Sequence, residues 1–283
     1  MKDADLHTHS TASDGTDSVY TVVETARERD IDCVAITDHD TLHEELDFRV
    51  EQRGDVELIN GAEIKAEIDG TKIEILSYFL DTSDPGLKEL TERIEELRVE
   101  RMQEMVERVN QVIEPELTMD DVEKEADGTL ARPHLAKALK RKGLVDTVSE
   151  AFEKFIGNNC EGYVPTKKLP AEEVIERVHE NGGVTSLAHP GRDLKGDEDE
   201  KVGKLADMGL DAIEVPYSYD RLESEHSIPI HFKEARAREL AEKHDLLVSG
   251  GSDSHGTESQ KDYIGNVRLD YEKVEKLKQK ARL

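Results

Sequence analysis

Short apolar segments that end near a histidine or a carboxylate recur along this sequence, and this pattern constrains the fold more than any other feature. The first such segment contains His7 and His9, and Asp14 follows shortly after it. Side chains alternate along an extended strand, so the two imidazoles lie on the same side. Both can therefore contact one metal ion. Asp14, beside the turn-forming Gly15, can add a carboxylate from the next loop.

The same arrangement recurs at later predicted strands, which alternate with segments of helical periodicity. Strands are expected at residues 31–36, 56–59, 184–188, 210–215 and 246–251. The polar residues within or just beyond these strand ends are His39, Glu63, His189, Glu214, Asp253 and His255. In a parallel β/α barrel the active site forms at the carboxyl ends of the strands. The sequence therefore predicts an α/β barrel with these side chains gathered at one end.

The gathered side chains have the composition of a catalytic metal site. The candidate ligands are His7, His9, Asp14, His39, Glu63, His189, Asp253 and His255. Imidazole and carboxylate ligands without a thiolate suit Zn, Mn or Fe ions that take part in a reaction. Eight ligands are too many for one ion, so two or three ions are expected. Asp38 and Asp40 flank His39, where they can either orient ligands or cap a helix.

The middle of the chain has a different pattern. Residues 86–160 show helical periodicity and no evident strand, which predicts a helical insertion between two parts of the barrel, residues 1–85 and 161–283. Within it, Arg132 and His134 flank a proline at a predicted helix start, where anions bind readily. A helix-capping role without function is the alternative for this pair. Residues 193–204 are charged and contain glycine, so a mobile loop leading into a short helix is expected.

The charge balance restricts the partners. The chain has 65 acidic and 38 basic residues and a formal net charge of -27. The acidic residues are spread over predicted helix faces, which favours a solvated surface suited to salt-rich surroundings over an acidic metal trap. Such a charge argues against an extended nucleic-acid-binding surface. No run is apolar enough to cross a membrane and no signal peptide begins the chain, so a cytoplasmic protein is expected.

Taken together, the motifs resemble those of the PHP (polymerase and histidinol phosphatase) superfamily. The matching motifs are DLHTHS, SDG, AITDHDT, GAE, ARPH, AHP and GSDSH, in that order. The chain is similar to the stand-alone metal-dependent phosphoesterases with a helical insertion, a branch that includes nucleotide-bisphosphate phosphatases and 5′-to-3′ exoribonucleases. The resemblance implies an α/β fold, a distorted (β/α)7 barrel of PHP type, with two or three divalent metal ions (Mn, Zn or Fe).

The resemblance also implies roles for individual residues. The first ion is expected at His7, His9, Glu63 and Asp253, the second at Glu63, Glu74 and His189, and the third at Asp14, His39 and His255. The last three are also the expected catalytic residues. The family usually has a histidine where this chain has Glu74. Substrate contacts are expected from Arg132, His134 and Arg192.

The function implied is hydrolysis of a phosphate ester by a metal-activated hydroxide. The expected substrate is a nucleotide, such as a 3′,5′-bisphosphonucleotide, or the 5′ end of a short RNA. The alternatives are a histidinol-phosphate-type small-molecule phosphatase, a non-catalytic metal-binding PHP module and a metal hydrolase of the amidohydrolase type. The oligomeric state stays open.

Overall fold

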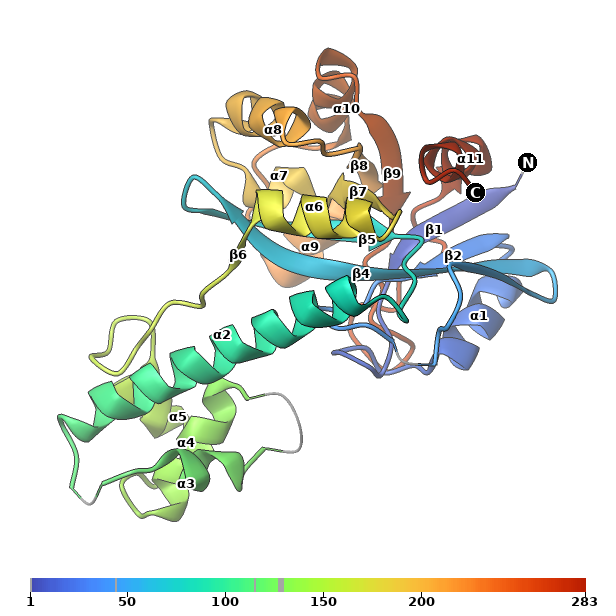
Figure 1. The fold of residues 1–283 in the computed structure, drawn as a ribbon. Helices are drawn as coiled ribbons and strands as arrows, with labels where there is room; N and C mark the ends of the chain where they lie inside the picture. The colour runs from blue at the N-terminus through green and yellow to red at the C-terminus, as the bar shows by residue number, and fades with distance from the viewer. Residues whose placement is uncertain (1, 44, 115, 127–129) are drawn as a thin grey trace. The chain divides into compact units, whose positions relative to one another are not determined.

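The computed structural model describes residues 2–43, 45–114, 116–126 and 130–283 (Figure 1). The chain forms two compact units, one of Met1–Thr91 with Leu169–Leu283 and the other of Glu92–Lys168. Helix α2 (Pro85–Asn110) begins in the first unit and continues into the second. Along the part of the chain that is described, no helix is both long enough and apolar enough to cross a membrane.

The first unit is built on a sheet that nearly closes into a barrel. Its strands are β1 (Asp3–Thr8), β2 (Cys33–Ile36), β4 (Val56–Ile68), β5 (Thr71–Tyr78), β7 (Val184–Leu187), β8 (Ala212–Tyr217) and β9 (Leu247–Gly251), and they pair in that order. A parallel bridge between Thr8 and Ser254 joins the end of β1 to the segment after β9, and Figure 1 shows the two strands side by side. The PHP-type α/β barrel predicted from the sequence is confirmed.

The barrel is distorted because β5 runs against its neighbours. It pairs antiparallel with β4 and with β7, whereas β1–β2, β2–β4, β7–β8 and β8–β9 are parallel. The strand expected at residues 56–59 is longer than predicted, because β4 continues to Ile68 and contains Glu63. Gly61 is needed there for a close approach, since a Cβ on it would lie 2.5 Å from the carbonyl oxygen of Ser77.

Shorter strands and a layer of helices complete the first unit. β3 (Val50–Arg53) and β6 (Leu169–Pro170) pair with β4, and β10 (Leu269–Asp270) pairs with β1. The helices are α1 (Val19–Glu28), α6 (Ala171–Glu180), α7 (Pro190–Asp193), α8 (Glu198–Asp207), α9 (Tyr219–His226), α10 (Glu234–Lys243) and α11 (Tyr271–Lys280). Residues 193–204, expected to be a loop before a short helix, instead contain the end of α7 and most of α8. Contacts such as Lys204 with Glu200, one helical turn apart, support α8.

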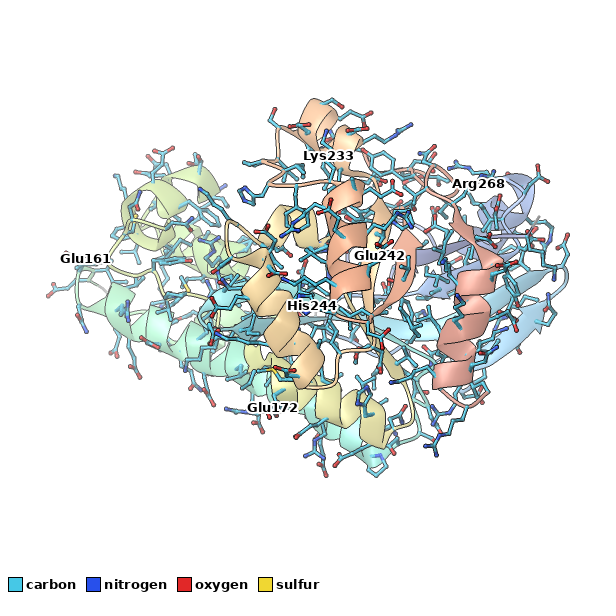
Figure 2. All side chains as sticks on the ribbon, turned by 90° about the horizontal axis from the view of Figure 1, so that it is seen from above. Glu161, Glu172, Lys233, Glu242, His244 and Arg268 are labelled. Atoms are coloured by element: carbon cyan, nitrogen blue, oxygen red, sulfur yellow. The ribbon has the colours of Figure 1, made fainter. Side chains whose placement is uncertain are left out.

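Apolar side chains from the inner face of the sheet and from the helices form the core. Leu6, Ile59 and Leu76 of the strands pack in one buried cluster with Val274 and Leu277 of α11. Many of the charged residues lie on the outer helices. Figure 2 shows side chains projecting from the outer helices, among them the exposed Glu172 of α6 and Glu242 of α10. The acidic excess is thus carried in part by solvated helix faces.

The second unit contains only helical elements among its described residues. After α2 these are α3 (Met119–Glu123), α4 (Arg132–Arg141), α5 (Val148–Ala151) and a π-helical turn, Phe152–Ile156. Met105 and Val109 of α2 pack against Leu135 and Leu139 of α4 in a separate buried core. The helix start predicted at Thr118 is confirmed, because the Thr118 and Asp121 side chains cap each other's backbone amides.

Asp211, just before β8, connects several elements of the first unit. Its buried carboxylate accepts the Thr185 backbone amide at 2.9 Å and the Thr185 hydroxyl at 3.1 Å, and lies 2.7 Å from His179 Nε2 of α6. Burial alone would raise the pKa of Asp211. The hydrogen bonds from His179 and Thr185 nevertheless hold this pKa below its usual range.

We expect Asp211→Ala to lower the free energy of unfolding at pH 7 by about 2–4 kcal/mol, because it leaves the buried Thr185 donors unpaired. The folded-state pKa of Asp211 is lowered, so its contribution is present above the unfolded-state value of about 4 and is lost as the pH falls through the folded-state value. Denaturant titrations at several pH values should show the gap between wild type and variant shrinking in acid. The exposed Asp207→Ala serves as control; a gap that does not change with pH would contradict this account.

Candidate metal centre

Most of the predicted ligands come together around the buried carboxylate of Glu63, in the middle of β4. Glu63 Oε2 lies 2.9 Å from His39 Nδ1, 3.4 Å from His7 Nε2 and 3.5 Å from His9 Nε2. Its other oxygen, Oε1, lies 2.9 Å from His189 Nε2. Four imidazoles therefore surround one carboxylate; His7 lies in β1, and the other three come just after β1, β2 and β7.

Asp253 closes the opposite side of His7 and His9. Its Oδ1 lies 3.2 Å from His9 Nε2 and 3.6 Å from His7 Nε2. Its Oδ2 accepts the Tyr217 hydroxyl at 2.7 Å and Lys261 Nζ at 2.9 Å. The lysine and the tyrosine hold one oxygen, so the other faces the imidazoles.

Asp14 forms a second group at a more open position. Its carboxylate lies 3.4 Å from His255 Nε2, 3.7 Å from His39 Nε2 and 3.9 Å from His9 Nδ1. The Asp14 side chain is 57% exposed and that of His39 is 20% exposed, whereas His9 is fully buried. One donor atom from each of these four residues lies within 4.8 Å of the others.

The loop that carries Asp14 is fixed by Asp38, at the end of β2. Asp38 accepts the Ser10 backbone amide at 2.8 Å, the Ser10 hydroxyl at 2.6 Å and the Ser13 hydroxyl at 2.6 Å. Asp38 therefore orders the segment between His9 and Asp14. Asp40 contacts the Lys65 amide at 2.8 Å and so joins the loop after β2 to β4.

Two carboxylates contact the ring nitrogens that face away from the centre. Glu214 of β8 lies 3.1 Å from His7 Nδ1 and accepts the backbone amide of His189 at 2.7 Å. Asp193 lies 3.0 Å from His189 Nδ1. Such partners orient imidazole ligands by fixing the ring and its proton. Neither role was predicted from the sequence. Glu214 could have been recognised as a carboxylate within a barrel strand, and Asp193 by its spacing of four residues from His189.

The donor atoms are close together but do not satisfy one another. Among the described residues, buried atoms without a correctly directed hydrogen bond include His7 Nε2, His9 Nδ1 and Nε2, His39 Nδ1 and Glu63 Oε2. Buried polar atoms normally have such a bond. These atoms instead surround a shared space, and a divalent ion there would satisfy several of them at once. The donor set therefore fits divalent metal ions.

The electrostatics of the cluster also suit ligation. Burial lowers the pKa of His9 to about 4, so this ring is neutral at pH 7 and one of its two nitrogens has a lone pair free for a metal ion. Burial alone would raise the pKa of Glu63, but His7 and His39 hold it well below the usual range, so the carboxylate is ionised. In contrast, although burial opposes it, Glu63 and Glu214 raise the pKa of His7 well above the usual value.

The remaining predicted site residues lie in two places. Glu74 of β5 has Oε2 at 3.2 Å from His189 Nε2, and Arg192 pairs with this carboxylate. Arg132 and His134 lie in the second unit, at the start of α4. His134 Nδ1 accepts the Ala131 amide at 3.1 Å and so caps the helix.

The chain is similar to known proteins in sequence and in fold. A model of the PHP domain family matches residues 5–182, more than half of the 283-residue chain. The chain belongs to the PHP domain family. This PHP chain is 31% identical over 256 residues to the 5′-3′ exoribonuclease Rnm of Salmonella typhimurium, a match that covers 89% of this chain and 84% of the relative.

Two further matches support the same family. The 3′,5′-nucleoside bisphosphate phosphatase of Chromobacterium violaceum is 27% identical to the PHP chain, over 90% of this chain and 88% of the relative. A solved structure of a candidate metal-dependent phosphoesterase from Bifidobacterium adolescentis superposes with a TM-score of 0.68 at 30% identity, covering 98% of this chain and 96% of that one. The prediction that the chain is a hydrolase of phosphate esters is confirmed at this level.

We expect Mn(II) binding at pH 7 to release protons, because the raised pKa of His7 means that a metal ion must displace a ring proton. Isothermal titration calorimetry in buffers of different ionisation enthalpy measures this release as a change in the apparent binding enthalpy. His244→Ala, at the end of α10 and outside the cluster, should show the same buffer dependence. An apparent enthalpy that is equal in all buffers would contradict the prediction.

Proposed function

We propose that this protein is a metal-dependent phosphoesterase that hydrolyses a phosphate ester of a nucleotide, such as a 3′,5′-bisphosphonucleotide, or the 5′ end of a short RNA. The observation that carries the proposal is the set of imidazoles around Glu63, with unsatisfied ring nitrogens directed at a shared space. The relatives named as an exoribonuclease and as a bisphosphate phosphatase support the substrate class.

The proposed ligands form three groups, and two of these groups share Glu63. The first ion is held by His7, His9, Glu63 and Asp253, the second by Glu63, Glu74 and His189, and the third by Asp14, His39 and His255. When bound, the ions lower the pKa of a coordinated water and stabilise the charge that develops on the phosphate oxygens. Asp14, His39 and His255 are proposed as catalytic residues because Asp14 and His39 are more exposed than the ligands proposed for the first ion, so an ion held there would be accessible to substrate.

The exposure of the side chains supports a direction of approach for the substrate. His7, His9 and Glu63 are at most 1% exposed, so water does not reach the floor of the centre. Asp14 and His39 are partly exposed, and the phosphate therefore enters on their side. Glu214 and Asp193 hold His7 and His189 in place during this step.

Arg132 and His134 of the second unit are proposed to bind a phosphate of the substrate. The Arg132 guanidinium lies 5.5 Å from the ring centres of Phe152 and of Tyr163 and donates to the Asn158 side chain at 3.0 Å, so its plane is fixed. Because His134 Nδ1 accepts the Ala131 amide, the neutral ring carries its proton on Nε2 and can donate it to an anion.

A neighbouring arginine supports this proposal. Burial and the charge of Arg132 lower the pKa of Arg101 on α2. Two guanidinium groups thus repel each other within one unit of a chain whose net charge is -27. A phosphate bound at Arg132 would reduce this repulsion.

The net charge of -27 favours a short substrate over an extended polynucleotide, because long-range repulsion grows with the number of phosphates. A histidinol-phosphate-type phosphatase would use the same metal centre. A non-catalytic metal-binding module is disfavoured because every predicted ligand other than Glu74 has the residue type that the family resemblance requires.

We expect Asp253→Ala and His39→Ala each to lower kcat by about 100-fold or more, since losing even a partner that orients a ligand typically costs about 10–100-fold. Phosphate release by metal-loaded protein measures the effect, and circular dichroism checks the fold. His244→Ala is the matched histidine control. Unchanged turnover in either site variant would remove that residue from the proposed centre.

We expect Arg132→Ala to raise KM by about tenfold or more without lowering the metal content, because it removes a charge-assisted hydrogen bond worth about 1.5–3 kcal/mol. Arg141→Ala, on the same helix, should leave KM near that of the wild type. Metal loss with an unchanged KM would place Arg132 outside the substrate site.

The substrate is tested with Mn(II)-loaded protein, a 3′,5′-bisphosphonucleotide and a 5′-phosphorylated oligoribonucleotide in parallel. Phosphate release from the bisphosphonucleotide alone identifies a nucleotide phosphatase. Stepwise release of mononucleotides from the oligomer identifies an exonuclease. Inactivity on both substrates despite bound metal would overturn the proposed substrate class.

A further inference from the structure

Glu74 differs from the other carboxylates of the metal centre in the partners that it has. Its Oε2 lies 3.2 Å from His189 Nε2, and the Arg192 guanidinium pairs with this same oxygen. The other oxygen, Oε1, lies 3.8 Å from Lys65 Nζ. Both oxygens of Glu74 therefore face a cationic side chain.

Asp253 differs from Glu74 in which of its oxygens contacts a cationic side chain. Asp253 also has a cationic partner, Lys261, but the lysine contacts Oδ2 while Oδ1 faces the histidines. In Glu74 the arginine occupies the oxygen that faces the histidine. An ion between His189 and Glu74 would need this oxygen, so it would compete directly with Arg192.

Arg192 is held in this position by a closed set of contacts. Its Nε donates to Asp193 Oδ1 at 2.8 Å, and Asp193 Oδ2 lies 3.0 Å from His189 Nδ1. His189, Glu74, Arg192 and Asp193 thus contact one another in a ring. The side chains of Glu74 and Arg192 are only 11% and 25% exposed, so water screens their charges weakly.

We propose that Arg192 is the resident cation of Glu74 and that it weakens divalent-metal binding at the Glu74–His189 position, so that this ion binds last and is lost first. Binding of the ion there displaces the guanidinium from Glu74. Asp193 retains the guanidinium through its own contact. This inference rests on the proposed function for the ligand groups, and it concerns the affinity of one position rather than the reaction.

The test is the Mn(II) content of the purified full chain after equilibrium dialysis over a range of free Mn(II), measured by mass spectrometry of the metal. Arg192→Gln should tighten the last-bound ion by about tenfold or more, because it removes a full charge next to the ion. Arg192→Lys keeps the charge and should remain close to the wild type. Arg236→Gln, an arginine of α10 that pairs with Glu198, is the control.

Substitutions of Glu74 distinguish this proposal from the alternative that Glu74 is an ordinary ligand of a tightly bound ion. At the Mn(II) concentration where wild type lacks its last ion, Glu74→Gln should leave the metal content unchanged. In the double variant Glu74→Gln/Arg192→Gln, the gain produced by Arg192→Gln should disappear. Circular dichroism checks that each variant is folded. If Arg192→Gln is not, Arg192→Ala in its place should show the same tighter last ion, and a folded Arg192→Ala protein that binds Mn(II) as the wild type does would contradict the proposal.

Two results would overturn the inference. One is an Arg192→Gln protein that binds Mn(II) as the wild type does. The other is loss of one ion from Glu74→Gln at low Mn(II), which would make Glu74 a resident ligand. Failure of the proposed function looks different, because the wild type would then bind no Mn(II) at any position of the centre.

Discussion

The buried carboxylate of Glu63 is the constraint on which the rest of the site depends. An ionised carboxylate without solvent costs several kcal/mol unless opposite charge surrounds it. Here the compensation comes from the charges of His7 and His39 and from the hydrogen bond with His189, three residues that belong to or follow three different strands. These strands reach one point only if the sheet curves into a barrel, so the fold and the charge balance of the site support each other.

The closure between β1 and β9 is correspondingly tight. A Cβ on Gly251 would lie 2.4 Å from the backbone nitrogen of His7, so only glycine allows the two strands to approach this closely. Asp253, two residues later, adopts φ +57°, and its amide donates to the His7 carbonyl at 2.9 Å. His189 also has a positive φ, +25°. The positive φ angles of Asp253 and His189 direct both side chains toward the centre. This backbone conformation costs free energy, and contacts with the surrounding barrel stabilise it.

The sequence predicts the barrel and the gathering of His7, His9, His39, Glu63 and His189 because strand periodicity and strand-end residues are local features. It does not predict the direction of β5, because alternating residues pair equally well in parallel and antiparallel sheets. Glu63 was expected just beyond a strand end, although it lies within the long strand β4. The role of Glu214 depends on contacts between segments that are far apart in the sequence. The same is true of the contact of Arg192 with Glu74, which no local pattern contains.

Because the net charge of the chain is -27, positive charges close to the site decide whether an anionic substrate can bind. An anionic substrate meets a repulsive long-range field, which salt screens over about 10 Å at 0.1 M ionic strength. Attraction must therefore come from groups within a few ångströms of the phosphate. In the first unit the metal ions proposed for the Glu63 cluster would supply this attraction, together with any part of the Arg192 charge that Glu74 and Asp193 leave uncompensated. An ion at the Glu74 position would place its own charge next to Arg192, so metal loading would favour the binding of an anionic phosphate.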